Sequence, residues 1–402
     1  MTERIYYTDS YLRNFTARVV EVTEGGRRVY LDRTAFYPTS GGQPFDTGTL
    51  AGIAMREAID EEDRVAHLLA APLDPATPGT EVAGVIDWTR RYDHMQQHTG
   101  QHLLSAVLQD LYAWPTVGFH MGAEVSTIDV RAASISAAQL ERAEERCAEI
   151  VALARPVIVT FEDASADLGL RKASARSGAL RILSIEGIDR SACGGTHVRS
   201  TSEIGAVLLR KTEKVRDSVR FEFVCGGRAL RRSRQDYGLL SSIARSLSST
   251  AEAVPDLVGA MIERGKAREK SAEKLSIELS RREGRELYLA TAPSADGLRY
   301  ATVRGAIDAV RARAQAFAAG EKAVFLAICE NPPSILLAVS PDSGWHAGDR
   351  VKAAAAAAGG RGGGNQTLAQ ATAPRLDDLL AALDVGQTSR STAGLHTGLP
   401  PK

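Results

Sequence analysis

The spacing of apolar side chains predicts a strand-rich beginning of the chain followed by a long helix. Runs of β-branched and apolar residues at 17–22 and 28–32 flank the turn signal Glu24-Gly25-Gly26, which predicts two strands. The region 93–112 has the period of a helix, and Asp93 is the expected N-cap. Its apolar face consists of Leu103, Leu104, Val107, Leu108 and Leu111.

The pattern changes again further along the chain. A helix is expected at 137–153, and buried strands are expected at 180–185 and 206–209. From 227 to 289 the chain is charged and almost free of β-rich runs, which predicts two helices with a break near Ser248-Ser249. A small α/β unit follows, with strands at 300–303, 323–329 and 334–339, helices at 306–318 and 376–383, a glycine run at 359–364 and a loose tail at 386–402.

Composition and charge narrow the class of protein. A length of 402 residues predicts two or three domains at about 150 residues each. The 44% hydrophobic content excludes global disorder, and the balance of 49 basic and 49 acidic side chains excludes a uniformly basic nucleic-acid binder. Neither a secretory signal nor a membrane-spanning run is expected, so the prediction is a soluble cytoplasmic protein. Cys147, Cys225 and Cys329 are expected to be reduced and to pack in cores.

Two short segments carry the candidate chemistry. In His94-Met95-Gln96-Gln97-His98-Thr99-Gly100-Gln101-His102, histidines recur every four residues, so they share one face of the predicted helix. In Cys193-Gly194-Gly195-Thr196-His197, a thiol and an imidazole flank two glycines that permit positive φ and close backbone approach. His98, His102, Cys193 and His197 form a ligand set that suits Zn²⁺, with one ion per chain. His94 is expected either to support these ligands or to face nucleic acid.

These segments resemble a known family. The segment 90–106 resembles the helix motif of the alanyl-tRNA synthetase editing domain and of its free-standing relatives, the AlaX proteins, and 187–198 resembles their second zinc motif. The segment 36–44, together with Asp46 and Gly48, is similar to their glycine motif. The glycine run before Ala369-Gln370-Ala371 is similar to the synthetase's C-terminal domain. Because the glycine motif begins at Phe36, the chain looks like the long form of AlaX, without an aminoacylation domain.

The resemblance implies an α+β fold in four parts. Residues 1–88 would form a small β-barrel-like subdomain with the glycine motif, and 89–226 the zinc-containing editing domain with the synthetase editing-domain fold. A helical arm, with a weak coiled-coil pattern, would occupy 227–292. Residues 293–402 would form the glycine-rich α/β domain. A homodimer through the arm or the last domain is a further expectation.

The resemblance also implies an activity. It is ATP-independent hydrolysis of the ester that joins serine to tRNA(Ala), with glycine as a second candidate amino acid, and it preserves translation fidelity. A pocket rejects an added hydroxyl poorly, whereas a second site that bonds the hydroxyl discriminates better. Four candidates for that pocket are Ser40, Gln43, Gln101 and His120. No general base is assignable, and zinc could either activate water or only organise the pocket.

Binding of tRNA requires contacts to phosphates. Between residues 210 and 234 nine basic side chains face three acidic ones, an excess of six positive charges in a neutral chain. The predicted tRNA-binding residues are Arg210, Lys211, Lys214, Arg216, Arg220, Arg231 and Arg361. Two other functions stay open: editing of a different mischarged tRNA, and tRNA binding without catalysis around a structural zinc.

Overall fold

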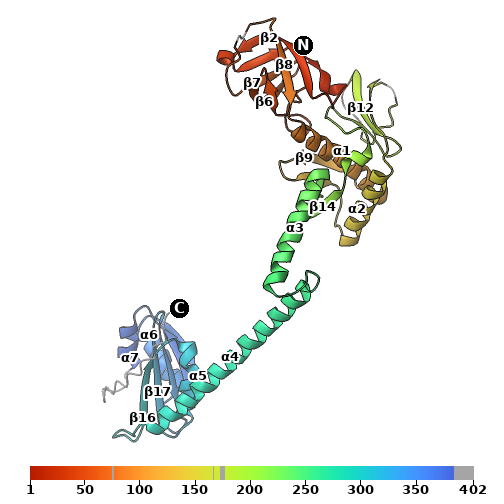
Figure 1. Ribbon diagram of the computed structural model, residues 1–402. Helices are drawn as coiled ribbons and strands as arrows, with labels where there is room; N and C mark the ends of the chain where they lie inside the picture. Colours follow the sequence, from red (N-terminus) through yellow and green to blue (C-terminus); the bar gives the residue numbers. More distant parts are fainter. Residues whose placement is uncertain (75–76, 166, 173–176, 384–402) are drawn as a thin grey trace. The chain divides into compact units, whose positions relative to one another are not determined.

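The computed structural model describes residues 1–74, 77–165, 167–172 and 177–383. The chain divides into two compact units, Met1–Ala251 and Glu252–Lys402. Both units mix strands and helices, so the predicted α+β class is confirmed (Figure 1). The predicted division into four parts stays a prediction, and the predicted tail at 386–402 lies outside the described residues. No helix among the described residues is long and apolar enough to cross a membrane.

The first unit begins with a closed six-stranded barrel. Strand β2 alternates buried and exposed residues, which places Phe15, Ala17 and Val19 in the barrel core. A short parallel pair, β1 (Glu3–Arg4) and β4 (Arg33–Thr34), lies beside it, with 3-10 turns at Ile5–Tyr7 and Glu24–Gly26. In order around the barrel the strands are β2 (Asn14–Thr23), β3 (Arg28–Leu31), β7 (Arg64–Leu69), β6 (Ile53–Glu61), β5 (Gly48–Leu50) and β8 (Glu81–Ile86).

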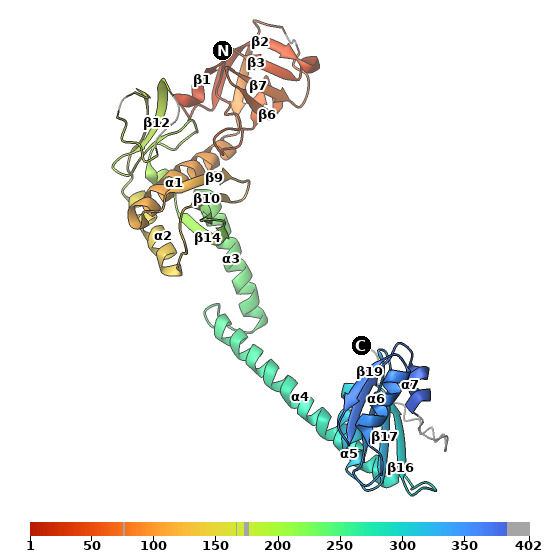
Figure 2. The same cartoon turned by 180° about the vertical axis from the view of Figure 1, so that it is seen from behind.

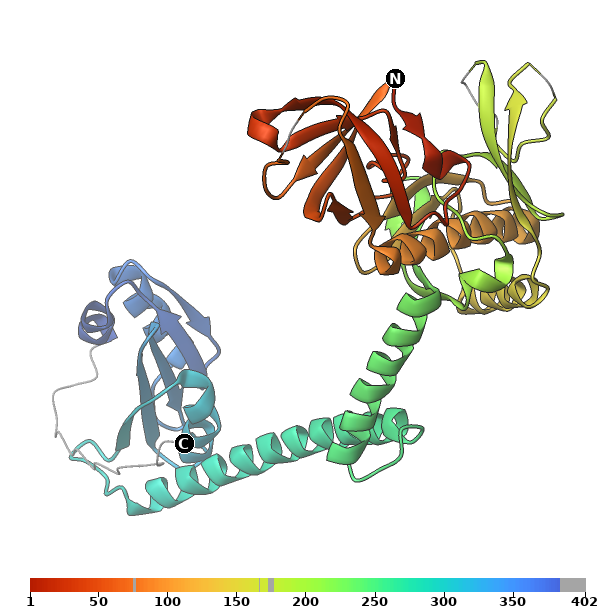
Figure 3. The same cartoon turned by 45° about the horizontal axis from the view of Figure 1, so that its top comes forward.

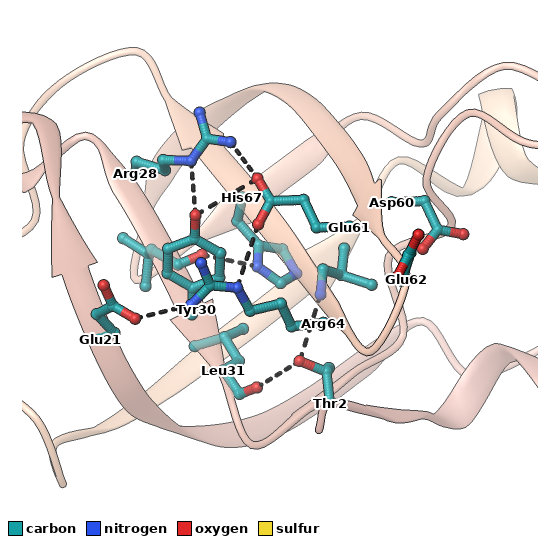
Figure 4. A network of polar contacts seen from close by, with 12 residues as sticks. Thr2, Glu21, Arg28, Tyr30, Leu31, Asp60, Glu61, Glu62, Arg64 and His67 are labelled. Atoms are coloured by element: carbon teal, nitrogen blue, oxygen red, sulfur yellow. Dashed lines mark hydrogen bonds and ion pairs between the residues drawn. The ribbon is translucent and has the colours of Figure 1, made fainter.

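Two polar arrangements hold the barrel strands together (Figure 4). On the outside, the Arg64 guanidinium stacks on Tyr30 and bonds to Glu21 and Glu61, while Arg28 bonds to Tyr30. Inside, the fully buried His67 bonds to the carbonyl oxygen of Val29 at 3.0 Å. Burial lowers the pKa of His67 to about 4, so this imidazole is neutral.

Helix α1 (Trp88–Tyr112) leaves the barrel and forms the centre of the unit (Figure 3). The prediction that Asp93 caps this helix was wrong, because the N-cap is Asp87, whose side chain accepts from the Arg90 N–H. Asp93 lies inside the helix and pairs with Arg228 at 2.6 Å. Arg91 is fully buried with Asp46, and their ion pair fixes α1 to the glycine motif.

Two sheets and a second helix surround α1 (Figure 2). Leu103, Leu104, Val107 and Leu108 pack on the sheet of order β14-β15-β10-β9 and on α2, as the predicted apolar face requires. A separate three-stranded sheet carries the Cys193 segment at its end. The elements are β9 (Thr116–Met121), β10 (Ser126–Val130), α2 (Ala137–Ala152), β11 (Val157–Asp163), β12 (Ala179–Ile185), β13 (Asp189–Ala192), η3 (Thr201–Ile204), β14 (Val207–Val215), β15 (Ser218–Cys225) and α3 (Gly226–Ser246).

The second unit is a five-stranded sheet with helices on both faces. Alternate residues of β17 enter different cores: Val324, Leu326 and Ile328 meet α6 and α7, whereas Phe325 meets α5. The sequence missed α6, and the predicted glycine run forms an edge strand, β19. The elements are α4 (Val254–Ala290), β16 (Arg299–Arg304), α5 (Ile307–Ala318), β17 (Ala323–Glu330), β18 (Pro333–Val339), α6 (Ala347–Ala357), β19 (Arg361–Gly364), β20 (Leu368–Thr372) and α7 (Leu376–Leu383).

Candidate metal centre and editing site

The two predicted ligand pairs come together in the structure. The ligand atoms of His98, His102, Cys193 and His197 all lie within 4.8 Å of one another. Cys193 Sγ lies 3.4 Å from His98 Nε2 and 3.2 Å from His197 Nε2. All three imidazoles are nearly buried. This cluster of nitrogen and sulfur donors is a site that could hold a metal ion.

The outer nitrogen of each histidine has a partner that fixes its tautomer. His98 Nδ1 lies 2.8 Å from Gln43 Oε1, and His102 Nδ1 lies 2.9 Å from Asp189 Oδ2. His197 Nδ1 lies 3.2 Å from Thr99 Oγ1. Each partner acts as an acceptor here, because Gln43 Nε2 donates to Thr196, Asp189 is a carboxylate, and the Thr99 hydroxyl donates to the carbonyl oxygen of Met95. In the neutral form of each ring the proton therefore sits on Nδ1, so the three Nε2 atoms are the ones that can offer lone pairs to a metal ion in the cluster.

The electrostatics of the cluster also favour a cation. Burial alone would raise the pKa of the Cys193 thiol, but His98 and His197 together hold it well below its ordinary value. Burial lowers the pKa of His197 to about 3. Burial opposes the charge on His102 too, yet the bond to Asp189 outweighs it and raises the pKa of His102 to about 9. A thiolate and neutral imidazoles are the forms that bind metals, so binding would release the His102 proton.

The glycine turn of the barrel delivers Gln43 to this centre. Ser40 and Gln43 exchange backbone hydrogen bonds of 3.1 and 2.9 Å across Gly41 and Gly42, whose φ values of 56° and 84° are those of a type I′ turn. A side chain at Gly42 would lie 2.9 Å from the Phe119 carbonyl oxygen. Glycine is therefore needed at this position both for its φ and for close packing.

The two glycines of the loop motif differ in their surroundings. Neither has the positive φ that the sequence allowed for. A Cβ at Gly195 would collide with the His98 ring, whereas a Cβ at Gly194 would meet only Tyr7 Oη at 3.6 Å. Gly195 is thus required by the close approach of the loop to His98.

A cavity of about 610 Å³ opens over the metal ligands. His98, His102 and Cys193 form part of its wall, and Phe119 stacks on His98. Other residues of the cavity wall are Tyr7, Ser40, Gln101, Arg171, Lys172 and Arg181. The volume is that of a small-molecule site.

The four predicted pocket residues differ in their placement. Ser40 and Gln101 line the cavity, and Gln101 Nε2 donates to Ser105 Oγ at 2.8 Å. Gln43 is fully buried and bonds to His98 and Thr196. His120 is exposed on β9 and is not one of the cavity-lining residues.

The remaining predicted site residues do not form one exposed patch: one is buried in α1, three are held by contacts within the protein, and four are exposed. His94 is buried one helical turn before His98, and burial lowers its pKa to about 3. Arg210 pairs with Asp236, Arg220 pairs with Asp129 at 2.7 Å, and Lys214 donates to the Ala133 carbonyl oxygen. Lys211, Arg216, Arg231 and Arg361 are exposed, with Lys211 4.0 Å from Glu213 and Arg231 3.8 Å from Asp93.

Sequence reasoning missed the residues that support the ligands. Asp189 bonds to His102 and is itself held by Arg171 at 2.6 Å and by Ser191. Thr99 accepts from the Val198 N–H as well as contacting His197. A usable signal was present, because a metal-binding histidine needs an acceptor on its second nitrogen and Asp189 is four residues before Cys193.

The fold and this site place the chain in a class shared by two synthetases. Residues 180–221 match the family model described as the threonyl and alanyl tRNA synthetase second additional domain. The chain belongs to the family of free-standing, AlaX-type alanyl-tRNA editing proteins, and this confirms the resemblance found in the sequence. Membership of the family rests on relatives that match more than half of this chain, and on this shorter match as well.

Three relatives illustrate the family. The alanyl-tRNA editing protein AlaX-L of Pyrococcus horikoshii is 36% identical over 275 residues, which are 66% of each chain. Alanyl-tRNA editing protein Aarsd1-B of Xenopus laevis is 33% identical over 236 residues, 57% of each chain. The alanine–tRNA ligase of Pyrococcus abyssi is 31% identical over 298 residues, 70% of this chain and 32% of the ligase. The chain thus spans between 57% and 66% of the length of these two editing relatives.

Proposed function

We propose that this protein is a hydrolase that releases serine, and also glycine, from mischarged tRNA(Ala). The observation that supports this most directly is the cluster of His98, His102, Cys193 and His197, whose first three members line a cavity large enough for an amino acid and a ribose. The relatives are named alanyl-tRNA editing proteins, in agreement with the proposal. The reaction would be the hydrolysis of an aminoacyl ester, without aminoacylation.

Zinc is the ion that this donor set favours. Three imidazole nitrogens and one thiolate are borderline-soft ligands, and their convergence agrees with tetrahedral coordination. When bound, zinc would supply a Lewis acid beside the substrate. The protein's own contribution is to orient the ligands through Gln43, Asp189 and Thr99.

Selection of serine would depend on a hydroxyl partner in the cavity. Gln101 already uses its Nε2 to donate to Ser105, so its carbonyl oxygen is the atom left to accept from a serine hydroxyl. Ser40 stands at the rim on the glycine turn. An alanyl group would leave the oxygen of the buried Gln101 side chain without this partner, which costs about 1–3 kcal/mol for a buried group.

The test is amino-acid release from seryl-, glycyl- and alanyl-tRNA(Ala), with metal content measured on the same samples. We expect fast release of serine, release of glycine, no release of alanine, and one zinc per chain. Seryl-tRNA(Ser) is the control for tRNA identity. Release from other mischarged tRNAs instead would favour a different editing reaction, and zinc without any release would favour a tRNA-binding protein with a structural metal.

Two further parts of the proposal concern partners. Lys211, Arg216, Arg231 and Arg361 are the predicted tRNA contacts that remain exposed, and their neutralisation should weaken tRNA binding in a salt-dependent way. Dimerisation through the helical arm or the last domain can be checked by light scattering of the full chain. A cytoplasmic location agrees with the four free cysteines.

A further inference from the structure

Arg181 is a buried cavity residue whose guanidinium is only partly satisfied. Its exposed fraction is 8%, and it forms part of the cavity wall together with Cys193 and His102. Nε donates to the Tyr7 carbonyl oxygen at 3.0 Å, and Nη1 donates to the Cys193 carbonyl oxygen at 2.7 Å. Nη2 is buried and has no hydrogen-bond partner among the described residues.

An unpartnered donor of this kind is costly. A buried polar group without a partner is destabilising, and more so when the group is charged. The two bonds to main-chain oxygens hold the guanidinium rigidly, and the Tyr7 ring lies beneath it at 5.5 Å. The fold therefore positions a cationic donor beside a candidate metal ligand and leaves one nitrogen for something that the protein does not supply.

The ligand of Nη2 must be an oxygen that accepts hydrogen bonds and tolerates a positive neighbour. Arg171, the other cavity arginine, is already paired with Asp189 at 2.6 Å, so it is not equivalent. In an aminoacyl ester the α-ammonium group is excluded by charge. The acyl carbonyl oxygen is the acceptor that lies at the reacting bond, and Nη1 reaches the main chain of Cys193 beside the ligand cluster.

We propose that Arg181 Nη2 binds the acyl carbonyl oxygen of the aminoacyl ester and stabilises the negative charge that develops on it. This proposal rests on the proposed hydrolase function. Water adds to the acyl carbon, and the carbonyl electron pair moves to the oxygen that Nη2 holds. This electron pair returns to re-form the carbonyl when the bond between the acyl carbon and the ribose oxygen breaks. The proton lost by the water ends on the ribose oxygen. Amino acid and free tRNA result.

The test compares R181Q and R181K with R190Q as a matched control. Arg190 is on the neighbouring strand β13 and pairs with Glu162, so R190Q removes the same charge from the same sheet. Release of serine is measured as kcat and KM, and zinc content and thermal unfolding are measured for every variant. Binding is measured for two analogues: seryl-3′-amino-3′-deoxyadenosine, an amide, and its tetrahedral phosphonamidate counterpart.

The expected result is a loss of about 100-fold in kcat for R181Q with a small change in KM. R181K should recover part of this loss. The phosphonamidate should lose affinity for R181Q by a similar factor, whereas the amide should change less than about threefold. R190Q should behave as the wild type.

Three outcomes would overturn the assignment. A rise in KM at constant kcat would assign Arg181 to ground-state binding, such as a phosphate contact. Equal losses for both analogues, or loss of zinc in both Arg181 variants, would make the residue structural. Wild-type kcat in R181Q would remove its role altogether. Absence of serine release by the wild type would instead remove the proposed function, and this inference with it.

Discussion

The cores of the two units differ in what they bury. Around α1, the amino-terminal unit buries Arg91, Gln97, Thr99 and Gln101 beside the three clustered histidines. In the part of the second unit that the structure describes, the buried polar side chains are the three serines Ser334, Ser340 and Ser343. Because burying polar groups opposes stability unless each is paired, a polar core indicates a site and an apolar core indicates a scaffold. Loss of the metal should therefore affect one unit and spare the other.

The largest expected effect is that of replacing Cys193, compared with replacement of the buried Cys329 in the second unit. C193A should abolish stoichiometric zinc and reduce serine release by about 100-fold or more. C329A removes a buried thiol from the second core and should leave both properties unchanged. Metal analysis and release assays on the two variants give the result. Equal effects would mean that the second unit also supports the centre.

Removal of zinc from the wild type extends this comparison to stability. A chelator should lower the unfolding temperature of the first unit only, since a ligand present at 1,000 times its Kd stabilises by about 4 kcal/mol. Scanning calorimetry with and without the chelator would show the difference. A single transition that shifts as a whole would show that the two units unfold together.

A comparison within the loop motif tests the close approach to His98. G195A places a methyl group against the His98 ring and should lower zinc affinity by about 10- to 100-fold, as for other disturbances of ligand orientation. G194A adds the same methyl group at a position with room for it, and it should stay within about threefold of the wild type. Competition with a chelating dye measures both. Equal zinc affinities of G195A and G194A would show that the close packing of Gly195 against the His98 ring is not needed for metal binding.

Replacement of Asp189, which accepts the hydrogen bond from His102 Nδ1, should also lower zinc affinity, by a smaller factor. D189N keeps the size of the side chain but replaces the carboxylate that holds Nδ1, and second ligand layers contribute about 10- to 100-fold in metal affinity. We expect the lower end of this range, because Ser191 and Arg171 keep the strand in place. D163N, on an exposed carboxylate of the same sheet, is the control. A D189N protein with wild-type zinc affinity would contradict the tautomer argument.

The sequence predicted the two halves of the metal site unequally well. The spacing of His98 and His102 is local information, because helical periodicity alone places them on one face. The union of this pair with Cys193 and His197 was inferred from ligand chemistry and supported by the resemblance, since nothing local relates residues 95 apart. The glycine turn shows the same limit: its shape is readable from Gly41-Gly42, but its contact with His98 arises only from packing of the barrel on α1.

Other errors have equally local causes. Asp93 looked like an N-cap because an acid precedes the apolar period, yet the helix starts one and a half turns earlier at Trp88, and Asp93 pairs with Arg228 from α3. The basic segment 210–234 looked like one patch, but Asp129 and Asp236, which lie outside it, neutralise two of its arginines. The alanine-rich α6 was missed because alanines gave it little apolar contrast.

The smallest predicted effect concerns a buried histidine away from the metal. His67 is enclosed in the barrel and bonds to Thr34 Oγ1 at 2.8 Å and to the Val29 carbonyl oxygen. Burial lowers its pKa to about 4 in the folded state, whereas the unfolded value is about 6.5. Between these two values the unfolded chain binds more protons than the folded chain, so stability falls as the pH falls through this range. The loss is about 2 kcal/mol on going from pH 7.5 to pH 5.

The variant H67Q separates the pH dependence of stability that His67 causes from that of all other titratable groups. Glutamine can still donate to Val29 and accept from Thr34 but does not titrate, so its stability should fall by about 2 kcal/mol less than that of the wild type over the same pH interval. Urea unfolding of both proteins at the two pH values measures the difference, in which carboxylates and metal ligands cancel. Parallel pH profiles would mean that His67 can be protonated without leaving the barrel core. The loss of stability at low pH would then come from other titratable groups, and the burial of His67 in the barrel would make no contribution to it.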